Sequence, residues 1–155
     1  MSDLCSTINS GLADCFEKIA AKLHHWVSPL SQEHFWRNPF PYGNDVGHLV
    51  LHLTGNLHYY IGAQIAATGY VRYRDVEFTD AARPPKAEVL QKFDDAIAMV
   101  AKTIRMQSTA GWSAAYSALG VDCPDRFSIV LDCAAHADHH VGQIINLSRE
   151  LTRSN

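Results

Sequence analysis

Four stretches of this chain place apolar side chains at every third or fourth residue, which is the spacing of one face of an α-helix. They cover about residues 3–27, 44–67, 86–106 and 124–151, and no strand-like segment lies between them. Each such helix must bury its apolar stripe, and 155 residues are enough to build one shared core. The pattern therefore predicts an all-α protein whose helices pack as a four-helix bundle, in a single domain over residues 1–155.

Residues that begin helices lie where these stretches start. Asn44 or Asp45 can cap the second helix, and Pro124 is expected to open the fourth. Two long connections, residues 28–43 and 67–85, leave room for crossovers between helices. The pattern of stripes alone therefore does not fix an up-and-down order.

Net charge, hydropathy and cysteine content limit the classes of protein to which this chain can belong. The net charge is -3, so the chain lacks the overall basic character of proteins that bind nucleic acid or anionic membranes. The most apolar stretch, residues 46–67, is interrupted by histidine, asparagine and glutamine, so we expect a buried helix and not a membrane span. The chain starts without a basic, then apolar, signal segment. Its four cysteines form no CxxC pair, and we expect reduced thiols in a cytoplasmic protein; they are Cys5, Cys15, Cys123 and Cys133.

Histidines are the most distinctive polar feature of the sequence, which contains nine of them. His136 and His140 lie four residues apart in the fourth helix, a spacing that lets two imidazoles hold one metal ion. His48 and His52 have the same spacing in the second helix. Chance alone gives roughly half such a pair for this composition, so spacing by itself is weak evidence.

The direction of each side chain adds to the spacing. At about 100° per residue, His140 lies about 40° and His136 about 80° from the centre of the apolar stripe, whereas His139 lies about 140° away. In the second helix, His52 lies about 120° and His48 about 160° from the stripe centre. The His136/His140 pair therefore faces the bundle, and the second helix discriminates less clearly.

Two interpretations of the His136/His140 pair remain open at this point. Three histidines from two helices would leave coordination positions free, as catalytic metal sites do, and neutral imidazole suits Zn²⁺, Ni²⁺, Cu²⁺ and Fe²⁺. Alternatively, the pair consists of half-buried histidines held by hydrogen bonds. Asp132, four residues before His136, either orients that ring or faces solvent.

Two segments resemble a known family. His136-Ala-Asp-His-His140-Val-Gly-Gln-Ile144 is similar to the HxxxHxGQI signature of the DinB/YfiT-like superfamily, and His52-Leu-Thr-Gly-Asn-Leu57 resembles its second-helix HLxGN motif. The order of the two motifs, the number of helices and the chain length also match the family, so the resemblance covers nearly the whole chain. The resemblance implies one DinB-like four-helix bundle in up-down-down-up order. It also implies a divalent metal held by His52, His136 and His140, with Zn²⁺ expected first and Ni²⁺ as the alternative.

The resemblance also implies a function. Characterised relatives include S-transferases that use low-molecular-weight thiols and a thiol-dependent maleylpyruvate isomerase, and many members are homodimers. We therefore expect a metal-dependent thiol S-transferase or hydrolase that acts on a small molecule and binds neither nucleic acid nor membrane. The alternative is a stress-associated protein that binds a metal or small ligand without turnover. A substrate-sized pocket would favour the enzyme, and a filled, apolar site would favour the binder.

The sequence leaves the catalytic and cofactor-binding residues unassigned, because no carboxylate falls evidently on the face of the ligands. Tyrosines and arginines alternate over residues 70–74, which we interpret as a solvated crossover loop; alternatively, the arginines meet a carboxylate of a substrate or thiol. The aromatic loop 35–42 either walls a pocket or, as we favour, covers one end of the core. Cys133 is expected to be a small buried residue, and Gly55 to permit close helix contact.

Overall fold

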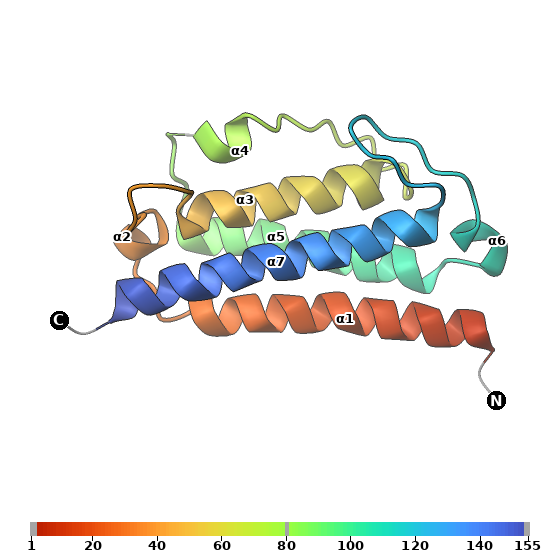
Figure 1. Ribbon diagram of the computed structural model, residues 1–155, viewed down its shortest axis with the longest axis horizontal. Coiled ribbons are helices and arrows are strands. Elements are labelled where there is room, and N and C mark those ends of the chain that lie inside the picture. The colour runs from red at the N-terminus through yellow and green to blue at the C-terminus, as the bar shows by residue number, and fades with distance from the viewer. Residues whose placement is uncertain (1–2, 80, 154–155) are drawn as a thin grey trace.

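The computed structural model describes residues 3–79 and 81–153, so the ends of the predicted 1–155 domain lie outside the described residues. The fold is all-α, as predicted, and no β-strand occurs within those two ranges. Four long helical segments lie side by side, with short helices in the connections (Figure 1). The long segments are α1 (Leu4–Val27), α3 (Val46–Leu57) continued by the π-helical η1 (His58–Ala63), α5 (Lys86–Arg105) and α7 (Arg126–Thr152). The short helices are α2 (Gln32–Phe35), α4 (Val76–Thr79) and α6 (Thr109–Trp112).

The four long segments share one core. α1 packs against α5 and α7, and α3 packs against the same two helices. In Figure 1, α1 and α7 run in one direction along the bundle and α3 and α5 run in the other. Each contributes large side chains that are fully buried, which supplies the main apolar burial of the fold; examples are Phe16, Leu53, Phe93 and Ile144.

Aspartate side chains cap three of the long helices. Asp3, Asp45 and Asp125 each accept a hydrogen bond from the backbone N–H three residues later. Of the two candidate caps for the second helix, the structure therefore selects Asp45. The prediction that Pro124 opens the fourth helix was wrong by two residues, because Asp125 takes the capping position and α7 begins at Arg126.

The second predicted helix ends earlier than expected. Its α-helical part stops at Leu57, the backbone continues as a π-helix to Ala63, and Ala67 adopts a positive φ of 53°. Gly62 lies in this π-helical segment, where an added Cβ would press against Met99 and Thr68. The chain then turns back along the outer side of α3 through α4 (Figure 1).

This returning connection covers the face of α3 that the stripe pattern assigns to solvent. Packing against α4 on this side and against α5 and α7 on the other leaves almost every residue of α3 buried, including His52. His48 is buried as well and packs against Trp36. Tyr73 and Arg74 in the connection are exposed as expected, but the Arg72 side chain is only 8% exposed. The interpretation of residues 70–74 as a wholly solvated loop was therefore wrong at Arg72.

Other expectations from the sequence concern smaller features. Phe35 and Trp36 are buried, and the Trp36 indole N–H donates to the Pro84 carbonyl, so these aromatics cover one end of the core. All four cysteines are free thiols. In the part of the chain that the structure describes, no helix has both the length and the hydropathy that a membrane span needs.

Candidate metal centre

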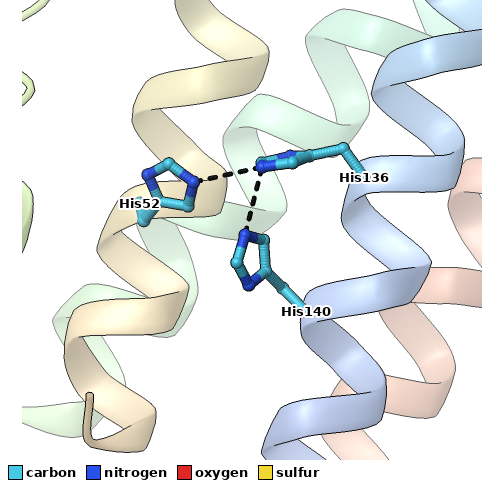
Figure 2. Close-up of side chains that lie close together, drawn as sticks. All are labelled: His52, His136 and His140. Carbon is cyan, nitrogen blue, oxygen red and sulfur yellow. Dashed lines mark hydrogen bonds between the residues drawn. The ribbon is translucent and has the colours of Figure 1, made fainter. Parts of the chain in front are cut away.

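Three histidines from two helices converge between α3 and α7. His52 comes from α3, while His136 and His140 come from successive turns of α7 (Figure 2). The Nε2 atom of His136 lies 3.2 Å from Nε2 of His52 and 3.1 Å from Nε2 of His140. One nitrogen from each ring lies within 4.8 Å of the others. The structure thus brings together all three residues that the sequence predicts as ligands.

A buried ion pair holds His52 from the side opposite to the cluster. His52 Nδ1 lies 2.9 Å from Glu77 Oε2, and Arg72 donates to both Glu77 oxygens, at 2.7 and 2.8 Å. The three side chains are each less than one-tenth exposed. Burial alone would raise the pKa of Glu77, but hydrogen bonds from Arg72 and His52 lower it below its ordinary value. Glu77 is therefore a carboxylate at neutral pH and needs a donor at its Oε2.

The Glu77 carboxylate fixes the tautomer of His52. The His52 nitrogen closest to this carboxylate is Nδ1, so Nδ1 carries the proton and donates it in a hydrogen bond to Glu77. Arg72 Nη2 also lies 3.3 Å from this Nδ1, but it donates to the closer Glu77 Oε2. With Nδ1 protonated, the lone pair of the neutral imidazole resides on Nε2, which faces the cluster.

Gly55 makes the approach of Glu77 possible. A Cβ at this position would collide with the Glu77 carboxylate. The close contact that the sequence predicts at Gly55 therefore exists, but its partner is a buried carboxylate from α4. This glycine lies about one turn from His52 on α3. Because it has no side chain, the Glu77 carboxylate can reach His52.

His140 is held by a neighbour on its own helix. Its Nδ1 lies 2.7 Å from Gln143 Oε1, so Nδ1–H donates to the amide and leaves the Nε2 lone pair facing the cluster. Burial lowers the pKa of His140, and the Gln143 hydrogen bond offsets this only in part. His140 is therefore neutral at pH 7.

His136 lies between the other two rings and has no support at its far nitrogen. Its Nδ1 is buried without a hydrogen-bond partner in the described chain. Burial, together with electrostatic repulsion from the neighbouring histidines and Arg72, lowers the pKa of His136 to about 4. Asp132 does not orient the ring, since it is exposed and accepts a 3.1 Å hydrogen bond from Cys123. Of the two roles left open for Asp132, the structure thus supports the solvent-facing one.

The donor set fits a divalent metal. Two nitrogens bound tetrahedrally to zinc at about 2.0–2.1 Å lie about 3.3–3.4 Å apart. The Nε2 separations of 3.1 and 3.2 Å are close to that value. His136 Nε2 can share only one proton or lone pair in its ring plane, so it cannot hydrogen-bond well to both neighbours. A cation that accepts all three lone pairs satisfies the cluster better and leaves a fourth position open.

Other candidate side chains do not join the cluster. His48 instead lies 2.9 Å from the Asp45 carboxylate and packs edge-on against Trp36. Cys133 is buried as expected, and burial raises the pKa of its thiol to about 12, so it remains protonated. His139 is exposed on the outer face of α7, as its position on the helical wheel predicts.

A cleft of about 510 Å³ opens directly beside the cluster. One wall comes from α3 and η1 with His52, Asn56 and Tyr60, and the facing wall comes from α7 with His136. α7 also contributes Ile129, Asp132 and Cys133. The connection after α3 adds Arg72 and Arg74, and the turn before α7 adds Leu119, Gly120 and Val121. The wall mixes apolar groups with an amide, a phenol and two guanidinium groups, as small-molecule sites commonly do.

Sequence reasoning did not identify the residues that support His52. Glu77 and Arg72 lie 25 and 20 residues beyond it, in a connection without helical periodicity. The only available signal was the pair of arginines in residues 70–74, for which a carboxylate partner was one of the alternatives. That partner is Glu77 of the chain itself.

The comparison with protein families matches residues 16–144 to the DinB superfamily. The match covers most of the chain, so this protein belongs to the DinB superfamily, and the resemblance noted from its two motifs is confirmed. A comparison with curated proteins found no match. Superfamily membership and the three-histidine cluster together fit a metal-binding protein.

Proposed function

We propose that this DinB-superfamily protein is a metal-dependent enzyme, a thiol S-transferase or a hydrolase that acts on a small molecule. His52, His136 and His140 hold the divalent ion, Zn²⁺ by preference and Ni²⁺ as the alternative. In the transferase, a low-molecular-weight thiol is the second substrate. When bound, the ion supplies the Lewis acidity that makes a thiol or a water molecule nucleophilic near neutral pH.

The cleft beside the cluster is the observation that carries this proposal. Two of the three histidines line it, and its volume of about 510 Å³ suits a small-molecule substrate. A protein that only stores a metal has no need of such a cleft at its ligands. Polar groups in the wall further favour an enzyme over a filled, apolar binding site.

The side chains around the ion each have a defined task. Glu77 and Gln143 hold the protons on Nδ1 of His52 and His140, so both rings present Nε2. Arg72 keeps Glu77 ionised. Because the Cys133 thiol remains protonated at neutral pH, the nucleophile comes from a bound molecule and not from the cysteine in the cleft wall.

Three further features belong to the proposal. The up-down-down-up order of the family is supported by the course of the long helices in Figure 1 and by their packing partners. The homodimer rests on the family resemblance. The cytoplasmic location rests on the free cysteines. Light scattering at micromolar concentration checks the homodimer, which a monomer mass would refute.

An activity panel tests the enzyme directly. Tag-free protein loaded with Zn²⁺ or Ni²⁺ is assayed with several small thiols against 1-chloro-2,4-dinitrobenzene, and with nitrophenyl esters for hydrolysis. We expect turnover in at least one arm and its loss in His136→Gln, which removes a ligand. Turnover no higher than in chelator-treated protein in every arm would overturn the enzyme and leave the non-catalytic binder.

A further inference from the structure

Two buried polar atoms in the cleft wall lack partners. They are Asn56 Oδ1 and His136 Nδ1, and both residues line the cleft. The only other such side-chain atom in residues 3–79 and 81–153 is Ser148 Oγ, twelve residues beyond His136 on α7. Folded proteins satisfy most buried polar groups. Two such atoms on residues that line one cleft favour a polar ligand there.

Asn56 is well placed to contact such a ligand. It lies one helical turn after His52 on α3 and is only 7% exposed. The π-helical η1 follows immediately and brings Tyr60 into the same wall. The cleft thus has a row of polar side chains that starts at the histidine cluster, and π-helical turns are common at functional sites.

The charges around the cleft are of opposite sign on different walls. Glu77 neutralises Arg72 through two hydrogen bonds, whereas Arg74 is exposed and forms no ion pair with any described residue. On α7, the exposed Asp132 also lines the cleft, and its Oδ2 accepts from the Cys123 thiol. One unpaired cation and one carboxylate therefore flank the same cleft.

We propose that the cleft binds a zwitterionic thiol of the amino-acid type. This inference rests on the proposed function and names its thiol substrate class. The carboxylate of the ligand binds the Arg74 guanidinium, in the paired geometry that Arg offers to carboxylates. Its ammonium group binds Asp132, its sulfur points toward the histidine cluster, and the Asn56 amide bonds to a polar atom between them.

Three small thiols test recognition of the carboxylate and of the ammonium group separately. L-cysteine carries both charges, cysteamine lacks the carboxylate, and 3-mercaptopropionate lacks the ammonium group. Each is titrated into protein loaded with Co²⁺, and the thiolate-to-cobalt absorption band reports binding. We expect L-cysteine to bind about tenfold more tightly than either analogue, the effect of losing one charge-assisted hydrogen bond. Gel filtration afterwards checks that the ion has stayed on the protein.

Matched variants assign each charge to its residue. Arg74→Gln should weaken L-cysteine about tenfold and leave cysteamine unchanged, while Asp132→Asn should weaken L-cysteine and leave 3-mercaptopropionate unchanged. The Asp132 variant also separates ammonium recognition from chelation of the ion by the amine. Arg37→Gln and Asp138→Asn remove exposed charges outside the cleft and serve as controls.

The relative affinities of the three thiols show whether the cleft recognises both charges of the ligand. Equal affinities for the three thiols, or equal losses in the control variants, would overturn it and leave the thiol-dependent enzyme standing. No absorption band with any thiol would overturn the thiol proposal itself, and the zwitterion site with it. Selective losses in Arg74→Gln and Asp132→Asn, with circular dichroism unchanged, would establish it.

Discussion

The two sides of the histidine cluster are built differently. On the α3 side, His52 rests on a buried carboxylate that a separate segment supplies and that an arginine keeps ionised. On the α7 side, His140 rests on the amide of Gln143 from its own helix, and His136 Nδ1 has no hydrogen-bond partner among the described residues. The comparison shows that one half of the site depends on tertiary packing, whereas the other half follows from the register of one helix.

The largest effect should come from breaking the buried support of His52. Glu77→Gln leaves Arg72 without its countercharge, and loss of one partner of a buried pair costs about 3 kcal/mol of unfolding free energy. The His52 ring also loses its anionic acceptor, so zinc affinity should fall about 10- to 100-fold. Urea denaturation and competition with a chromophoric chelator measure the two effects.

Glu88→Gln is the matched control, because Glu88 forms an exposed pair with Lys92. Its stability should change by less than about 1 kcal/mol, and its zinc affinity should not change. Equal effects of the two substitutions would contradict the special role of Glu77.

Filling the space at Gly55 should also weaken the support of His52, but by a smaller amount than removing the Glu77 carboxylate. The added methyl group of Gly55→Ala collides with the Glu77 carboxylate and displaces it from His52, so zinc affinity should fall about tenfold. Gly142→Ala on α7 is the control, since a Cβ there meets nothing within 4 Å. It should stabilise the protein by about 0.5–1 kcal/mol through helix propensity and leave the metal in place. Stabilisation by both substitutions would refute the close contact at Gly55.

The α7 side should be more tolerant. Gln143 is exposed, so water can replace its amide as the acceptor for His140 Nδ1. We expect Gln143→Leu to weaken zinc binding less than tenfold and to leave the unfolding free energy nearly unchanged. A loss as large as that in Glu77→Gln, measured by the same competition assay, would show that the two sides are equivalent.

The smallest effect is the dependence of stability on pH in metal-free protein. The pKa of His136 is about 4 in the folded state, below its ordinary 6.5. Between these values the unfolded chain binds more protons, so the unfolding free energy should fall as the pH falls from about 6.5 toward 4. Thermal or urea unfolding across this range should show a shallower decline in His136→Gln. An identical decline in both proteins would refute the low pKa of His136.

The same division explains what the sequence could predict. Apolar periodicity identified the helices, and the register of α7 placed His136 and His140 toward the bundle, because both depend only on local geometry. The wheel of the second helix put His52 about 120° from its apolar stripe, yet His52 is buried. The wheel assumes one buried face, whereas α4 packs against the opposite face of α3.

The support of His52 could not be predicted for the same reason. Glu77 reaches His52 through a connection whose path depends on how it packs over α3, and this packing carries no periodic signal. Gly55, which permits the contact, resembled a general packing glycine in the sequence. The family motif selected His52 over His48, and in the structure only His52 joins the cluster.

The metal content per chain shows whether His52, His136 and His140 hold an ion. Tag-free protein, His140→Ala and His139→Ala are measured by inductively coupled plasma mass spectrometry after reconstitution with Zn²⁺ and with Ni²⁺. We expect about one ion per chain in the original protein and in His139→Ala, which changes an exposed neighbour, and loss of the ion in His140→Ala. No bound metal in the original protein, or equal metal in His140→Ala, would contradict it.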